Sequence, residues 1–196
     1  MRTSRIRLRH VRPGDYERLH EIESDPATQS TWRYRGMLPP IDEYEPALWK
    51  QTSALLVVEN LADGLVIGYL HLHDVEPRAG HGWFSLYAGP EHRGRGTVME
   101  GLMLFCDWVF GNTSLRWIYA HAFEQNVGQF RSGIRRGEAH HLGALRERVM
   151  VDGEPTDVHV IGISRDGWNG SALQQRLHRL QARSAESDDA DTTSPD

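Results

Sequence analysis

The stretch Tyr87-Ala-Gly-Pro-Glu-His-Arg-Gly-Arg-Gly-Thr-Val-Met-Glu100 marks a change of pattern in the 196-residue chain. Alternating side chains precede it from His81, which predicts a strand that ends at Gly89. Residues 97–110 follow it and are nearly all apolar, which predicts a helix packed on most sides. A strand, a glycine-rich turn and a buried helix in this order expose main-chain N–H groups at the helix start, where they suit a phosphate or pyrophosphate.

The glycines and arginines of this turn have separate roles in that prediction. Gly94 and Gly96 let the backbone approach an anion closely, and Arg93 and Arg95 add positive charge. The alternative is a loop that uses glycine for turning and arginine for solubility, which is the commoner explanation of an isolated Gly-x-Gly. Its position between a strand and a buried helix favours the anion site. It is not a Walker loop, because no Gly-Lys-Ser/Thr follows, and it is not a dinucleotide fingerprint, which needs a wider glycine spacing.

The rest of the chain supplies strands and helices around this segment. Continuous or alternating apolar runs predict strands, and apolar residues three or four apart predict helices. Strands are expected at 6–11, 53–59, 65–74, 81–88, 115–123 and on both sides of a turn at 152–153; helices are expected after residue 13, within 25–50, at 97–110, at 126–136 and after residue 168. This order predicts one α/β (α+β) domain with a mixed sheet of about seven strands.

The composition limits the classes of protein to which the chain can belong. With 39% hydrophobic and 25% charged residues it is typical of a soluble globular domain. The net charge of −5 argues against nucleic-acid binding, and no apolar run approaches the ~20 residues that span a membrane. The single cysteine, Cys106, cannot form an internal disulfide, and the N-terminus lacks the apolar stretch of a signal peptide. We therefore expect a cytoplasmic protein.

The C-terminal part changes character after Trp168. Leu173, Leu177 and Leu180 are spaced as on one face of a helix, whereas the last residues are acidic and lack large apolar side chains. We expect a folded domain at 1–168, an amphipathic helix at 169–183 and a disordered acidic tail at 184–196.

The turn resembles a known family signature. Arg93-Gly-Arg-Gly96 followed by Glu100 is similar to the Arg/Gln-x-x-Gly-x-Gly/Ala coenzyme A motif of GNAT (GCN5-related) N-acetyltransferases, in the branch of ribosomal-protein and antibiotic N-acetyltransferases. Asn126, Gly137 and the hairpin 152–157 fall where that branch has an asparagine, a helix-ending glycine and its last hairpin. The likeness covers residues 6–168 and implies a GNAT fold.

The resemblance also implies an activity. A member of this family moves an acetyl or other short acyl group from acetyl-CoA or another acyl-CoA to a primary amine, directly within a ternary complex. The acceptor would be a small molecule or a peptide, and no metal takes part. Homodimers are common in the branch, and the residues do not decide between a monomer and a homodimer.

The resemblance assigns roles to individual residues. Main-chain N–H groups of 93–98 would hold the pyrophosphate, the strand end at 87–89 would pair with the pantetheine arm, and Asn126 would bond to that arm near the thioester. The expected coenzyme residues are Tyr87, Ala88, Gly89, Arg93, Gly94, Arg95, Gly96, Thr97, Val98 and Asn126.

The chain departs from the family pattern at two places. Val98 replaces the usual Gly or Ala, so we expect its side chain to crowd the pyrophosphate site. Gln129 and Gly133 occupy the positions at which family members have a serine or tyrosine acid, and Ser132 is the neighbouring hydroxyl. A non-catalytic acyl-CoA-binding homologue, acting as a binding or partner module, is therefore the alternative to an enzyme.

Three of the expected strands carry histidine and aromatic residues at alternate positions. The sets are Tyr69, His71 and His73, then His81, Trp83, Ser85 and Tyr87, then Trp117, Tyr119, His121 and Phe123. If these faces coincide, they form a wall that suits an amine or peptide acceptor. We predict His121 or His73 as the base or as a group that holds a water molecule, and the expected catalytic residues are His121, His73, Asn126 and Ser132. Half-buried, hydrogen-bonded strand residues are the alternative.

Two other clusters have weaker claims to function. A zinc site on His71, His73 and His121 lacks a Cys or acidic partner at recognisable spacing, so no metal is expected. The aromatic residues Trp32, Tyr34, Tyr44 and Trp49 form either the acceptor pocket or part of the core.

Overall fold

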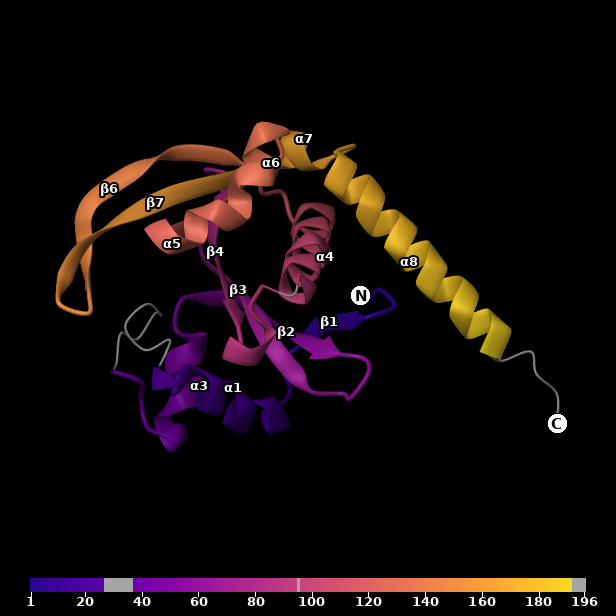
Figure 1. The fold of residues 1–196 in the computed structure, drawn as a ribbon, viewed down its shortest axis with the longest axis horizontal. Coiled ribbons are helices and arrows are strands. Elements are labelled where there is room, and N and C mark those ends of the chain that lie inside the picture. Colours follow the sequence, from indigo (N-terminus) through magenta and orange to yellow (C-terminus); the bar gives the residue numbers. More distant parts are fainter. Residues whose placement is uncertain (27–36, 95, 192–196) are drawn as a thin grey trace.

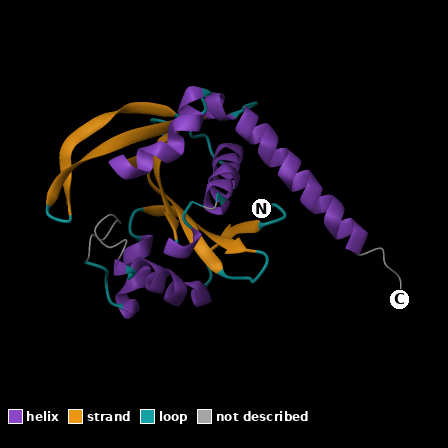
Figure 2. Ribbon diagram, in the orientation of Figure 1, coloured by secondary structure: helices purple, strands orange, loops and turns teal. Residues whose placement is uncertain are grey.

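A seven-stranded sheet forms the centre of the molecule, in the order β1-β2-β3-β4-β5-β7-β6 (Figure 1 and Figure 2). The computed structural model describes residues 1–26, 37–94 and 96–191. The strands are β1 (Ile6–His10), β2 (Thr52–Asn60), β3 (Val66–Glu76), β4 (His81–Ala88), β5 (Trp117–Phe123), β6 (His140–Val151) and β7 (Glu154–Ser164). Neighbouring strands are antiparallel except β4 and β5, which are parallel. The predicted α/β fold with a mixed sheet is confirmed.

Helices cover both faces of the sheet (Figure 1). On one face α4 packs over a large apolar cluster that includes Phe84 and Phe105. On the other face α1 and α3 close a second cluster around Tyr44 and Tyr69. The helices are α1 (Tyr16–Glu23), α3 (Ile41–Trp49), α4 (Thr97–Asn112), α5 (Glu124–Val127), α6 (Arg131–Arg135), α7 (Arg165–Trp168) and α8 (Ala172–Asp191). Within the described ranges, no helix is long and apolar enough to cross a membrane.

Helix α4 is covered along part of its charged stripe. The sequence predicts a stripe open to water at Glu100 and Asp107, but Glu100 is only 2% exposed and is paired with Arg5 and Thr3. Asp107 accepts hydrogen bonds from the Trp168 indole at 3.3 Å and from Gln174 at 2.9 Å. The expectation of a wetted stripe is wrong at Glu100, which the N-terminal segment covers, whereas the Asp107 side chain, beside the start of α8, remains 30% exposed.

Two helical segments differ from their expected boundaries. The single helix predicted at 126–136 is divided into α5, a 3₁₀ turn at Gly128–Phe130 and α6, since glycine weakens a helix interior. Helix α8 begins after residue 171 and continues to Asp191, beyond the expected end at 183, because Ala182, Arg183 and Ala185 are good helix formers. Its C-terminal half leads away from the sheet (Figure 1), and residues 192–196 lie outside the described part.

Arg165, at the start of α7, closes the C-terminal end of α4. Its guanidinium donates hydrogen bonds to the carbonyls of Phe110, Thr113 and Leu115, the last at 2.9 Å. A cation at a helix C-terminus satisfies carbonyls that have no intrahelical partner and complements the helix dipole.

Replacing Arg165 with alanine should lower the free energy of unfolding by about 2–3 kcal/mol, because several carbonyls lose a charged donor. Urea unfolding followed by circular dichroism measures this change. The matched control is Arg146→Ala on β6, where the side chain is exposed and the change should stay within about 0.5 kcal/mol. Equal losses in the two variants would contradict a capping role for Arg165.

Candidate active site

The parallel pair β4–β5 separates partway along its length. Only three residue pairs join the strands, the last being Trp83 with Tyr119. Beyond that pair, β4 continues to Ala88 and β5 to Phe123 without further pairing between them among the described residues. Facing strand edges therefore lie open at the carboxyl ends of two parallel strands, which is where α/β sheets commonly bind ligands.

The turn between β4 and α4 has the backbone geometry of an anion-binding loop. Gly94 and Gly96 have φ angles of +73° and +76°, a left-handed conformation that favours glycine. Helix α4 has sixteen residues, and no side chain of the described residues caps its N-terminus. The hydroxyl oxygen of Thr97 is buried and has no hydrogen-bond partner among the described residues. Main-chain N–H groups and one hydroxyl are thus available at this helix start.

The two arginines and the valine of the signature are placed differently from one another. Arg93 is exposed and lies along the end of β4, where its Nε donates to the carbonyl of Ala88 at 3.3 Å. Arg95 lies outside the described residues. Val98 is 5% exposed and packs into the core cluster beneath the sheet. The expectation that the Val98 side chain crowds the anion site is therefore wrong.

The end of β4 offers its backbone rather than its side chains. The Tyr87 ring is buried against Tyr69, at 5.7 Å between ring centroids, and its hydroxyl donates to the carbonyl of Ile22. The Gly89 N–H donates to the carbonyl of Ile67 on β3 at 2.9 Å. Any contact of residues 87–89 with a ligand would thus come from main-chain atoms on the side of β5.

Asn126 and Ser132 lie on the helices that follow β5. Asn126 is half-buried on α5, directly after the strand, and its Oδ1 accepts a hydrogen bond from Gln129 at 3.2 Å. Ser132 is exposed on α6 and accepts a hydrogen bond from Arg136. Ser132 also lines a cavity of about 430 Å³ that reaches Gly96 and the first turns of α4. Ser132 is therefore on the helix side of the site, at the cavity beside α4, whereas Asn126 lies just past the end of β5.

The predicted histidine and aromatic faces coincide. Residues of β3 and β4 are paired in register, with His71 opposite Ser85 and His73 opposite Trp83. On β5, the ring of His121 is 4.4 Å from that of Trp83, and the side chain is exposed. We call this face of β3, β4 and β5 the aromatic wall.

The two histidines of β3 differ in their surroundings. His71 is buried and contacts the Thr52 hydroxyl at 2.6 Å, so it belongs to the structure of the sheet. His73 is half-buried and contacts both Asp74 and Ser85. The contact with Asp74 is not predicted from the sequence, although an acid directly after the last histidine of a strand is a signal that could have suggested it.

Other candidate groups are placed away from this site. Tyr44 is fully buried in the second core cluster, Trp49 is partly exposed and donates to the Tyr16 hydroxyl, and Trp32 and Tyr34 lie outside the described residues. In the part of the chain that the structure describes, no three His, Cys, Asp or Glu side chains are grouped to hold a metal ion.

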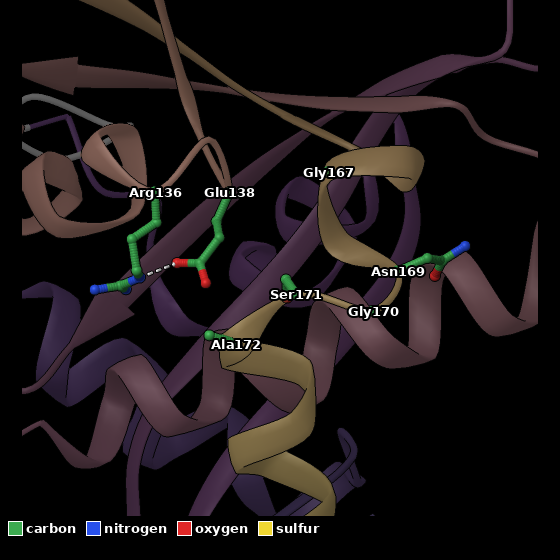
Figure 3. A pocket seen from close by; sticks show the side chains of 7 residues that line it. All are labelled: Arg136, Glu138, Gly167, Asn169, Gly170, Ser171 and Ala172. Carbon is green, nitrogen blue, oxygen red and sulfur yellow. Dashed lines mark hydrogen bonds and ion pairs between the residues drawn. The ribbon is translucent and has the colours of Figure 1, made fainter.

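A second pocket lies at the start of α8 (Figure 3). Its charged side chains, Arg136 and Glu138, form an ion pair at 2.8 Å, and the Glu138 carboxylate also accepts from the Leu173 N–H. Since the protein itself caps this helix start, the pocket differs from the start of α4.

Cys106 is a core residue of α4. Burial, with a smaller contribution from Asp107, raises the pKa of its thiol, so the reactive thiolate is suppressed. We expect a thiol reagent such as DTNB to label the native protein at least about 100-fold more slowly than the urea-unfolded protein. Equal labelling rates in the two states would contradict this assignment.

Comparisons with known proteins agree with this arrangement. A family model described as an acetyltransferase (GNAT) domain matches residues 5–132. The chain is 26% identical over 129 residues to a probable N-acetyltransferase, YjcK, of Bacillus subtilis strain 168, covering 65% of this chain and 71% of that protein.

Solved structures with the same fold include two of spermidine N-acetyltransferase from Vibrio cholerae. One, in complex with CoA and spermine, has a TM-score of 0.72 at 21% identity and covers 83% of this chain and 97% of that chain. Another, in complex with manganese ions, has a TM-score of 0.69 at 23% identity and covers 84% of this chain and 95% of that chain. Since the family model matches more than half of the residues, the chain belongs to the GNAT acetyltransferase family and transfers an acyl group from acyl-coenzyme A to an amine.

Proposed function

We propose that this protein transfers an acetyl or other short acyl group directly to the primary amine of a small molecule. The observation that carries the proposal is the separation of β4 and β5 beside a helix start that no described side chain caps. The open strand edges suit the amide-containing pantetheine arm, and the helix start suits the pyrophosphate. One molecule of acyl-coenzyme A would occupy both places, with its thioester near the point where the strands separate.

The residues around α4 fit that substrate. Gly94 and Gly96 have positive φ angles that allow the backbone to approach an anion closely, and the N–H group of Val98 lies in the first turn of α4. Thr97 adds a hydroxyl that lacks a partner among the described residues. On coenzyme binding, Arg93 would release the Ala88 carbonyl, which would then accept a hydrogen bond from the pantetheine arm. Arg93 and Arg95 would contribute positive charge beside the phosphates. Asn126, at the end of β5, would bond to the arm from the other side.

The acceptor would meet the aromatic wall. The ring centroid of Trp83 lies 5.5 Å from that of Tyr119 and 4.4 Å from that of His121. Aromatic faces attract ammonium groups. The net charge of −5 also favours cationic partners. Two structures of the same fold come from an enzyme named for spermidine. We therefore propose a small cationic amine, with polyamines as the first class to examine.

An amine must be neutral to attack the thioester, so a base belongs on the wall. Of the wall histidines only His71 is buried, and His81 lies at the paired end of β4, opposite Trp117. His121 and His73 therefore remain as the candidate bases, and either reaches the side of the sheet from which an acceptor would approach. Ser132 is placed toward the cavity at α4, so we assign it no part in proton transfer from the amine. Solvent would protonate the leaving thiolate.

The test is release of free coenzyme A from acetyl-CoA, measured with a panel of polyamines, aminoglycosides and peptides. We expect amine-dependent release with at least one small cationic amine and a product whose mass is increased by one acetyl group. Calorimetric titration with coenzyme A should show binding in the absence of an amine. Binding without turnover across the whole panel would contradict the proposal and favour a binding module.

A further inference from the structure

The wall contains a histidine that is held from both sides. His73 Nδ1 lies 2.6 Å from Asp74 Oδ2, and His73 Nε2 lies 3.2 Å from Ser85 Oγ. Ser85 is on β4 and Asp74 directly follows His73 on β3. A hydroxyl, an imidazole and a carboxylate in this sequence of contacts have the geometry of an oriented general base.

The contacts fix the proton positions on the imidazole. A carboxylate only accepts hydrogen bonds, so Nδ1 of His73 carries the hydrogen that it donates to Asp74. In a neutral imidazole the other nitrogen, Nε2, is then an acceptor, and the Ser85 hydroxyl donates to it. Ser85 Oγ therefore has lone pairs available for an incoming N–H donor. The contact with Asp74 thus favours the tautomer that a base working through Ser85 needs.

The backbone places Asp74 for this contact. Its φ angle is +45°, and it lies in an irregularity of the β3–β4 ladder between His73 and Glu76. Its N–H donates to the carbonyl of Gln51, another residue with a positive φ angle of 62°. Non-glycine residues rarely adopt this region, and such backbone outliers are frequent at functional sites. The bulge turns the carboxylate onto the histidine that precedes it.

The group is also placed beside the gap between β4 and β5. The last paired residues are Trp83 and Tyr119, and Ser85 is the next residue of β4 on the same face. The His73 side chain is 22% exposed and that of Asp74 47%, so a solute can reach the group. Around His73, the neighbouring polar or charged groups are His71, stacked at 4.6 Å, Thr52 opposite on β2, Ser85 and Asp74.

We infer that Ser85, His73 and Asp74 form a proton relay that serves as the general base for the acceptor amine. This inference rests on the proposed function. The amine nitrogen bonds to the thioester carbon, and the C–S bond breaks, so that the electron pair leaves with the thiolate. The proton lost by the amine passes to Ser85 Oγ while the Ser85 proton passes to His73 Nε2. Asp74 is a positioning residue that stabilises the resulting imidazolium, which later releases its proton to solvent.

The kinetic test uses a double-mutant cycle in the full-length protein. His73→Ala should lower kcat by about 10²-fold or more and remove the acidic limb of the pH–rate profile. Asp74→Asn and Ser85→Ala should each lower kcat by about 10-fold with little change in the acceptor KM. Asparagine tolerates a positive φ, so Asp74→Asn keeps the backbone. In the His73→Ala background, neither substitution should cost further activity.

Two controls separate the relay from structural damage. Glu76→Gln removes an exposed carboxylate from the same strand and should leave kcat unchanged. Free imidazole should restore part of the activity of His73→Ala, as an added base would. The relay is wrong if Asp74→Asn lowers kcat by the same factor in the wild-type and His73→Ala backgrounds. It is also wrong if the pH–rate profile of His73→Ala keeps its acidic limb.

A spectroscopic readout distinguishes this inference from the proposed function. Long-range ¹H–¹⁵N spectra of histidine-labelled protein, assigned with His73→Ala, should show His73 protonated at Nδ1 and lose that preference in Asp74→Asn. A hydrogen at Nε2 would overturn the relay even if the protein transfers acyl groups. Absence of transfer by the wild type, with coenzyme A bound, would instead overturn the proposed function and the relay with it.

Discussion

Replacing Gly96 with valine should weaken coenzyme A binding by at least about 100-fold, measured by calorimetric titration. Gly96 precedes α4 with a φ angle of +76°, and a β-branched residue is a strong outlier there. The space next to its Cα is open, so a side chain would project toward the solvent-facing helix start. Loss of two or more charge-assisted contacts to the pyrophosphate accounts for the expected change.

Gly64→Val is the matched control for this substitution. Gly64 has a nearly identical φ angle of +73°, its surroundings are equally open, and it lies in the turn between β2 and β3. Both variants should lose similar stability through backbone strain, but only Gly96→Val should lose affinity. Unchanged affinity in Gly96→Val would show that the start of α4 does not contact the coenzyme.

The largest effect on stability is expected for Gly68→Ala, which should lower the free energy of unfolding by about 3 kcal/mol. A Cβ atom on Gly68 would lie 2.3 Å from the carbonyl oxygen of Tyr87, and a backbone atom cannot move aside as a flexible side chain can. The substitution therefore pushes β3 away from the end of β4. Urea unfolding monitored by tryptophan fluorescence measures the loss.

The control for this second prediction is Gly111→Ala, near the end of α4. No atom lies within 4 Å of the Cβ that it would add, and alanine is the better helix former. We expect this variant to gain up to about 1 kcal/mol. If Gly68→Ala is as stable as the wild type, the close approach of β3 and β4 at this point is not tight.

Much of the fold is predictable from the sequence because its elements have clear periods. The continuous apolar run of β2 and the nearly all-apolar α4 are placed within a few residues of their observed ends. The segment after β5 is less predictable, since Gly128 and Gly133 divide one expected helix into short pieces. Propensity alone does not say that α5 packs against β5 and β7 whereas α6 packs against β6.

The candidate site is only partly predictable, because it depends on register. The glycine turn is visible as a local pattern, and alternate histidines predict one face of each strand. The contact of His73 with Ser85, however, depends on how β3 pairs with β4, and that of Asp74 on a bulge. The direction of the Val98 side chain likewise follows from how α4 packs on the sheet.

The three residue pairs between β4 and β5 make a seam between two half-sheets, β1–β4 and β5–β7. A seam this short is where local opening costs least, so amide hydrogens along it exchange with solvent sooner than those in the centre of either half. A substrate that spans the seam is bound only when both halves are in place, and it shifts the balance against opening. Coenzyme bound across the seam would then slow proteolysis of this protein.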